Sequence, residues 1–298
     1  MITNYKRPII VAEIGCNHKG SMDIAEQLIV LAAKCGATYA KFQKRDNKYL
    51  LGKEYLKPHP VPENSYGTTY GEHRENLEFS VSQHANLSRI CKKNGINYAV
   101  SVWEKKSALK IIESKIKLDY LKVPSACNLD FELLEILAKK FKKKIHLSLG
   151  MTSRKETKKI VSFFSKHNRL KDVILYACTS DYPADFENTC LLEICNLINN
   201  YRNKIHEIGF SGHHLGIGID NAAYTLGARY VERHFTLDRT WKGTDHAASL
   251  EPSGLEKLSR DLNNCFKSLK FKSKTGILAA EKFQRSKLKK RLNIIKAT

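Results

Sequence analysis

The feature that most constrains the fold of this chain is its rhythm. Short β-branched apolar runs alternate with longer amphipathic segments along most of the 298 residues. The apolar runs predict strands, and the segments between them have the period and length of helices. Strands are expected at residues 9–13, 38–43, 97–102, 119–123, 144–148, 172–177, 206–211 and 229–234. Helices are expected at residues 21–35, 80–94, 104–115, 130–141, 153–167, 188–201, 218–227 and 253–268.

Eight strands, each followed by a helix, within about 250 residues is the pattern of a (β/α)8 barrel. The expected fold class is therefore α/β, a TIM barrel with a short basic C-terminal extension. A doubly wound open sheet is the alternative, because sequence does not show whether a sheet closes. The expected division is a barrel domain over residues 1–268 and the extension over residues 269–298.

Composition narrows the class of protein. Hydrophobic residues make up 42% and charged residues 27%, which excludes a wholly disordered chain. No apolar run approaches the ~20 residues of a membrane span, so none is expected. The N-terminal apolar stretch has no small-residue cleavage site, so no signal peptide is expected. Eight cysteines without a CxxC pair predict reduced, mostly buried thiols in a cytoplasmic enzyme.

The net charge is +21, and about half of this excess lies in the last 32 residues, where eleven Lys and Arg face one acid, Glu281. Such a balance favours anionic partners, namely nucleic acid, a membrane surface or small phosphorylated substrates. A solvated lysine-rich surface is the plain alternative. Aromatic residues are not interleaved through the tail, so nucleic-acid binding is not the expected main function.

Two long segments interrupt the rhythm. Residues 44–78 join the second strand to its helix, and residues 238–251 follow the last strand. Both fall on the face of a barrel that carries active sites. Long loops in compact domains are usually functional or mobile, and residues 68–79 are a candidate lid in which His73 and Arg74 add positive charge.

Side chains just past the strand ends converge on one pocket in a barrel. Polar residues at these positions are Glu13, Lys41, Gln43, Ser101, Lys122, Ser125, Ser148, Tyr182, Ser211, His213, His234 and Asp245. Two lysines inside apolar strands, with serine hydroxyls nearby, describe a cradle for phosphate and carboxylate. The alternative is that each lysine turns outward or pairs with Glu or Asp.

Two histidines follow the seventh and eighth strands, which are neighbours in a closed barrel. His213 and His234 together form a candidate site for a divalent metal. Glu13, next around the ring, is a candidate oxygen ligand or base. Asp245 and His246 are further candidates, whereas His214 is expected in the surrounding shell or at the surface.

At this point the residues resemble the N-acetylneuraminate (sialic acid) synthase family, which includes legionaminate and pseudaminate synthases. The resemblance runs from about residue 8 to residue 268. It rests on the ordered blocks IIVAEIGCNHKGSMDIAEQLI (9–29), ATYAKFQ (37–43), LKVPSACN (121–128), HLSLGMTS (146–153), YACTSDYP (176–183), GFSGHHLGIG (209–218) and VERHFTLDRTWKGTDHAASLEP (231–252).

The resemblance implies a synthase that condenses phosphoenolpyruvate with the open-chain aldehyde of an N-acylated hexosamine. Such a reaction yields phosphate and a nine-carbon 3-deoxy-2-ulosonic acid. Residues matching the positions that hold phosphoenolpyruvate are Lys41, Lys122, Ser125, Ser148 and Ser211. His213 and His234 match the metal pair, usually for Mn²⁺ or Mg²⁺, whereas Glu13, Gln43, Tyr182 and Asp245 match residues around the metal and sugar. Catalytic roles are expected for Glu13, His234 and Asp245, and the resemblance also implies a homodimer.

The chain departs from the family pattern at the pocket. The usual Ser-Asp-His reads Ser211-Gly212-His213, the PSGE-like turn reads PSAC (124–127), the STP-type strand end reads SVW (101–103), and the NxY pattern reads SDY (180–182). The small antifreeze-like domain that typically follows the barrel is not expected. These departures leave two alternatives open: the same chemistry on a different aldehyde, such as a phosphorylated or non-acylated sugar, and a catalytically weakened barrel that binds a ligand.

Overall fold

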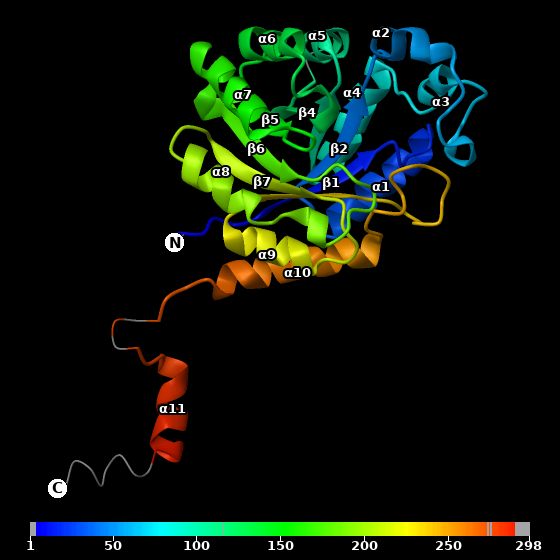
Figure 1. The fold of residues 1–298 in the computed structure, drawn as a ribbon. Coiled ribbons are helices and arrows are strands. Elements are labelled where there is room, and N and C mark those ends of the chain that lie inside the picture. The colour runs from blue at the N-terminus through cyan, green and yellow to red at the C-terminus, as the bar shows by residue number, and fades with distance from the viewer. Residues whose placement is uncertain (1–3, 115, 273, 275, 290–298) are drawn as a thin grey trace, which may run out of the picture.

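The eight predicted strands form a closed parallel barrel in which β1 pairs with both β2 and β8. The computed structural model describes residues 4–114, 116–272, 274 and 276–289. Closure confirms the TIM barrel and excludes the open-sheet alternative (Figure 1). The strands are β1 (Ile9–Gly15), β2 (Tyr39–Lys44), β3 (Asn97–Val102), β4 (Tyr120–Val123), β5 (Lys144–Ser148), β6 (Val173–Cys178), β7 (Glu207–Gly212) and β8 (Tyr230–His234).

The outer helices follow the expected order. They are α1 (Met22–Lys34), α4 (Val81–Lys93), α5 (Lys105–Glu113), α6 (Phe131–Lys140), α7 (Arg154–Lys166), α8 (Glu193–Tyr201), α9 (Gly218–Leu226) and α10 (Pro252–Ser268). Capping boxes at Ser80 and Ser153 fix where α4 and α7 begin. The expected start of α8 at residue 188 is wrong: Cys190 has a φ of 49°, a left-handed conformation that a helix cannot contain.

The strands are buried on both faces, and the two faces contact different parts of the protein. Outward apolar side chains such as Ile10 and Phe42 pack against the helices in one large core cluster. The inner face carries an aromatic layer of Tyr39, Tyr120, Tyr176 and Tyr230 with His146. The rings of Tyr120 and His146 stack with centroids 3.6 Å apart. This layer, here called the aromatic floor, fills the barrel beneath the functional pocket.

The long connection from β2 to α4, here called the lid segment (residues 45–79), has structure of its own. It contains α2 (Asn47–Leu51), α3 (Tyr70–Asn76) and 3₁₀ turns at Gly52–Leu56 and Pro62–Asn64. Tyr66 Oη donates to the Lys242 carbonyl at 2.5 Å, and Gly243 N–H donates to Asn64 Oδ1 at 3.3 Å. These contacts bring the two long segments together at the barrel mouth.

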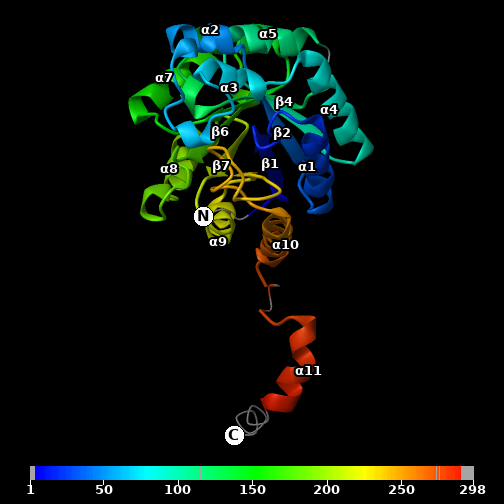
Figure 2. The ribbon, with the colours of Figure 1, turned by 90° about the vertical axis from the view of Figure 1, so that its right-hand side faces the viewer.

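Beyond α10, the basic extension includes a further helix, α11 (Ala279–Leu288). Both ribbon views place it clear of the barrel (Figures 1 and 2), and none of its residues is buried. Residues 290–298 of the predicted extension lie outside the described residues. Across the part of the chain that is described, none of the helices has the length and apolar character needed to cross a membrane.

Candidate functional site

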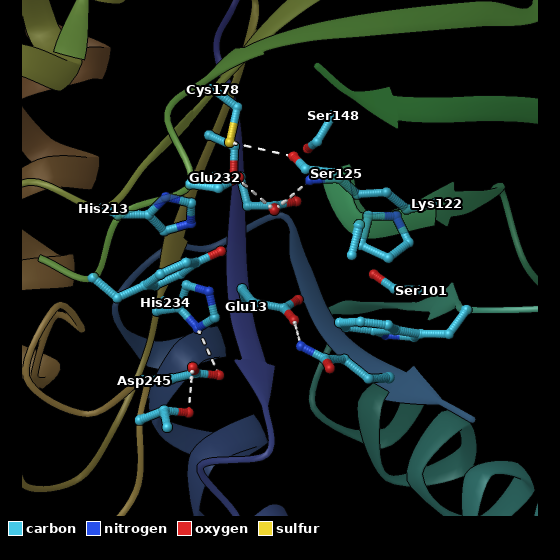
Figure 3. Close-up of a pocket in the computed structure, with 18 of the residues that line it drawn as sticks. Glu13, Ser101, Lys122, Ser125, Ser148, Cys178, His213, Glu232, His234 and Asp245 are labelled. Atoms are coloured by element: carbon cyan, nitrogen blue, oxygen red, sulfur yellow. Dashed lines mark hydrogen bonds and ion pairs between the residues drawn. The ribbon is translucent and has the colours of Figure 1, made fainter. Parts of the chain in front are cut away.

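The structure brings the predicted strand-end residues to a single cavity of about 600 Å³ at the carboxyl ends of the strands (Figure 3), whereas the further candidate His246 lies outside it. The volume lies in the usual range for small-molecule sites. The predicted residues that line it are Glu13, Lys41, Gln43, Ser101, Lys122, Ser125, Ser148, Tyr182, Ser211, His213, His234 and Asp245. Convergence follows from strand alternation, which points every second side chain of each strand into the barrel. Their roles stay predictions.

The two lysines point inward, but they are not free. Lys41 Nζ forms an ion pair with Glu13 and lies 3.7 Å from Glu232 Oε2, whereas Lys122 Nζ pairs with Glu232 Oε1. All four side chains are at most 5% exposed. The structure therefore shows the alternative in which each lysine pairs with a carboxylate. A buried ammonium group needs such a partner. An incoming anion would share the lysines with Glu232.

Glu232 was not predicted as a site residue, although the alternation of side chains in β8 indicates it. In β8, Tyr230, Glu232 and His234 alternate with Val231 and Arg233, so the carboxylate must share the inner face with the predicted metal ligand. Figure 3 shows Glu232 between the Lys122 and His213 sides of the pocket.

The two buried carboxylates differ in their affinity for a proton. Burial raises the pKa of Glu13, and neighbouring Lys41 offsets this only in part. Burial acts in the same direction on Glu232, but Lys122 and Lys41 outweigh it and hold its pKa at about 2. Burial also lowers the pKa of Lys122. Glu13 is therefore the carboxylate better suited to accept and release a proton, and Glu232 stays charged.

Serine hydroxyls surround the lysines. Ser101 Oγ accepts a hydrogen bond from Lys41 Nζ at 2.8 Å, and Ser211 Oγ donates to Glu232 Oε1 at 3.1 Å. Ser125 Oγ accepts from the Gly150 N–H at 3.1 Å. Together with the lysines, these hydroxyls supply the point charges and donors that a phosphate or carboxylate needs.

The two histidines of the predicted metal pair are neighbours, with ring centroids 5.4 Å apart. His213 Nδ1 lies 2.7 Å from the Thr179 carbonyl, which can only accept, so this nitrogen carries the proton and Nε2 offers a lone pair. His234 Nδ1 is buried without a hydrogen-bond partner and lies 3.7 Å from Asp245 Oδ2. Burial lowers the pKa of His234 to about 4, which favours a neutral ring.

These donors fit a divalent cation held by two imidazoles, with Asp245 close by. Within the described ranges, no cluster of three or more His, Cys, Asp or Glu side chains is arranged as a ligand set. Burial opposes protonation of His213, but contact with Cys178 outweighs it and raises the His213 pKa.

Three further histidines that the sequence singled out lie outside the cavity. His214 is fully buried rather than at the surface, with Nε2 3.0 Å from Arg233 Nη1. His246 Nδ1 lies 2.7 Å from Thr236 Oγ1. His73 is buried within the lid segment, whereas the adjacent Arg74 does line the cavity.

Arg45, Trp103 and Cys178 also line the cavity and were not predicted. Arg45 and Trp103 follow β2 and β3 directly, so the strand-end rule applied one residue further would have found them. The guanidinium of Arg45 stacks on Trp103, 3.8 Å from the ring centroid.

The sequence and the fold are similar to those of known proteins. The sequence matches the NeuB family model over residues 28–274. The chain belongs to the NeuB family. It is 38% identical to human N-acetylneuraminate-9-phosphate synthase over 85% of this chain and 68% of that protein. It is 31% identical to Campylobacter jejuni N,N'-diacetyllegionaminic acid synthase over 98% of this chain and 84% of that protein.

A solved structure of similar length also matches. The Leptospira borgpetersenii N-acetylneuraminic acid synthetase, solved with citrate, has a TM-score of 0.79 and 27% identity, covering 96% of this chain and 93% of that one. The predicted family, barrel and synthase class are thereby confirmed for this NeuB-family chain.

Two of the departures from the family pattern have local structural reasons. A Cβ added at Gly212 would lie 2.7 Å from Phe210 Cε1 and 2.8 Å from His214 Cε1, so these rings would have to shift to admit an Asp side chain. Cys127 is buried in the outer core, so its thiol faces away from the cavity that Ala126 lines.

Proposed function

We propose that this NeuB-family chain condenses phosphoenolpyruvate with the aldehyde of an N-acylhexosamine-type sugar. The products are phosphate and a nonulosonic, sialic-acid-like acid. The observation that carries the proposal is a pocket in which Lys122 and serine hydroxyls lie on one side and His213 with His234 on the other. Lys41 also lines this pocket, with its Nζ 2.8 Å from Ser101 Oγ. Synthases of sialic and legionaminic acids among the relatives support the same chemistry.

Separate residues of the chain bind phosphoenolpyruvate and transfer the proton in the proposed reaction. Lys41, Lys122 and the serines bind the phosphate and carboxylate of phosphoenolpyruvate. Its C3 then forms a bond to the aldehyde carbon, whose oxygen becomes an alkoxide. Water adds at C2, and the C2–O bond to phosphate breaks as C2 becomes a ketone. One proton of the water passes to the alkoxide, and the other leaves with phosphate. Glu13, the carboxylate with the raised pKa, takes the proton of that water. Holding both substrates in one cavity makes their encounter a positioned reaction.

A divalent cation, Mn²⁺ or Mg²⁺, is part of the proposal. His213 and His234 would hold it, with Asp245 beside His234. When bound, such an ion acts as a Lewis acid on the aldehyde oxygen. Tyr182, whose ring lies 4.1 Å from that of His213, bounds this side of the pocket and positions the sugar.

A second candidate keeps the reaction but changes the aldehyde. Gly212 and the PSAC turn (124–127) remove acidic groups that the family pattern places at the pocket, and the 9-phosphate synthases among the relatives favour a phosphorylated sugar. A catalytically weakened, ligand-binding barrel is the third candidate, which the retained lysines and histidines disfavour. The homodimer and the cytoplasmic location stay predictions.

The test is phosphate release and product analysis with phosphoenolpyruvate, Mn²⁺ and a panel of hexosamine-derived aldehydes. We expect turnover that a chelator removes and added Mn²⁺ restores. His234→Ala should abolish it, whereas His246→Ala, outside the cavity, should retain metal dependence. Undiminished turnover by His234→Ala would refute the metal assignment, and no turnover with any aldehyde would refute the synthase.

A further inference from the structure

Arg45 lines the cavity but has no part in the reaction proposed above. It follows β2 directly and is 5% exposed. Its guanidinium stacks on Trp103, donates to Gln43 Oε1 from Nη2 and donates to Cys16 Sγ from Nη1 at 3.3 Å. No carboxylate of the described residues forms an ion pair with it. Buried arginines are usually paired with an acid, so the contact with a neutral amide suggests another use for this side chain.

The side-chain amide of Gln43 forms a bridge between Arg45 and Glu13. Gln43 Nε2 donates to Glu13 Oε1 at 2.7 Å, and Gln43 Oε1 accepts from Arg45. A guanidinium has donors and no acceptor, so only the amide oxygen can face Arg45. The amide N–H group is then turned toward the carboxylate. An amide rotated by half a turn would instead set its oxygen against the Glu13 carboxylate, where two acceptors repel each other.

The backbone at Gly15 leaves room for this bridge. Gly15 has a φ of 55°, and the pairing of β1 with β2 is irregular between Glu13 and Gly15. A Cβ at Gly15 would lie 2.9 Å from Gln43 Nε2 and 3.1 Å from Glu13 Oε1. Any larger residue would therefore displace the amide or the carboxylate, and glycine lets the two groups meet.

Each oxygen of the Glu13 carboxylate has its own partner. Lys41 Nζ pairs with Oε2, and Gln43 Nε2 donates to Oε1. The side chain of Glu13 is only 3% exposed, so these two contacts, rather than bulk water, set its orientation. A general base must lie within hydrogen-bond reach of the proton that it takes, so its orientation matters as well as its affinity for that proton.

We infer that Arg45 is a positioning residue for Glu13 and that it acts through the Gln43 amide. The inference rests on the proposed function, in which Glu13 takes a proton from the attacking water, and it names the residue that orients this base. Arg45 selects the orientation of the amide, and the amide N–H then holds Glu13 Oε1. The oxygen of Gln43 is occupied by Arg45, so it is not free to bind the sugar.

The experiment is a mutant cycle made of Arg45→Met, Gln43→Met and the double variant, assayed by phosphate release. Methionine keeps much of the length of both side chains and removes their polar groups. Arg45→Lys is the conservative variant, because lysine keeps a donor for Gln43 Oε1. Arg260→Met is the matched control, because this arginine is 62% exposed on α10 and pairs with the adjacent Asp261. Thermal melts confirm folding of each variant.

We expect Arg45→Met and Gln43→Met each to lower kcat by roughly 10- to 100-fold, the range for a hydrogen bond to a charged group. The double variant should be no slower than Gln43→Met alone, because both changes act along the same path. The KM for phosphoenolpyruvate should change little. Arg45→Lys should recover part of the loss, and Arg260→Met should behave as wild type.

A second cycle needs no turnover. Urea unfolding compares Arg45→Met, Glu13→Gln and their combination, first with Gln43 present and then in Gln43→Met. In Glu13→Gln either orientation of the Gln43 amide finds a partner, so the loss of Arg45 should matter less. The effects on the unfolding constant should therefore fall short of independence by roughly 3- to 10-fold when Gln43 is present. In Gln43→Met they should be independent.

The outcomes separate this role from the proposed function. Undiminished kcat in Arg45→Met refutes the positioning role and leaves the synthase standing. A rise in the KM for phosphoenolpyruvate that accounts for the whole loss assigns Arg45 to that substrate instead. If wild type turns over no aldehyde, the synthase fails, and the urea cycle decides: coupling that depends on Gln43 supports the bridge, and its absence refutes it.

Discussion

Replacing Glu232 by glutamine removes a negative charge that contacts both buried lysines. Removing one partner of a buried ion pair typically costs about 3–5 kcal/mol. Lys41 keeps Glu13 as a partner, so we expect the lower end, about 3 kcal/mol of unfolding free energy. The pKa of Glu232 is lowered in the folded state, so its contribution is present above pH 4.5 and is lost as pH falls toward 2.

The assay is urea unfolding at pH 7, with Glu207→Gln as the matched control. Glu207 also contacts two cations, Lys6 at 2.5 Å and Arg229 at 3.2 Å, but those partners are 60% and 28% exposed. We expect the control to lose at most about 1 kcal/mol. Equal losses in the two variants, or no loss in Glu232→Gln, would refute the interpretation of the buried network.

The same variant makes a prediction about ligands. Without Glu232, Lys122 has no carboxylate partner among the described residues, so an anion gains more by binding there. Inorganic phosphate should therefore raise the unfolding midpoint of Glu232→Gln more than that of wild type. An equal rise in both proteins would show that Glu232 does not compete for the lysines.

Three further outcomes follow from local structure. Burial holds the pKa of His84 at about 3, so below about pH 6.5 this ring lowers the free energy of unfolding by roughly 1.4 kcal/mol per pH unit. In His84→Gln, the pH dependence of the urea-derived unfolding free energy between pH 6.5 and 4 should decrease by the slope that corresponds to about one proton. An unchanged slope would contradict this. Gly212→Ala should cost about 1–3 kcal/mol in the same assay because its Cβ would overlap Phe210, and a cost near zero would mean that the ring yields. Tyr66→Phe removes the hydrogen bond to the Lys242 carbonyl, so the KM for the acceptor sugar should rise severalfold with little change in Tm. An unchanged KM would show that this contact does not contribute to sugar binding.

The barrel was predictable because its signal is periodic and local. Each strand is a short run rich in apolar residues, and inward alternation then fixes which side chains meet at the mouth. The start of α8, which was predicted wrongly, depends on the backbone conformation of Cys190, which composition does not reveal. The helices of the lid segment are short and are stabilised by tertiary contacts such as Tyr66 to Lys242.

The pairing inside the site was less predictable for an electrostatic reason. Sequence indicates that Lys41 and Lys122 lie inside, but not which acid neutralises them, because partners such as Glu232 are far away in the chain. Arg74 shows the same limit: its helix is local, but its place over the cavity depends on how the lid segment meets residues 242–243.

The aromatic floor has a consequence for the route by which molecules enter and leave the pocket. Tyr120, Tyr176 and His146 seal the barrel axis, and the ring of Tyr176 lies 4.3 Å below Lys122 Nζ. Among the described residues this layer closes the barrel axis, so the substrates and products of the proposed reaction would pass through the mouth beside residues 45–79. On the proposed reaction, phosphoenolpyruvate on the lysines would enter before the sugar, and phosphate and the acid that keeps the phosphoenolpyruvate carboxylate would leave through the same opening.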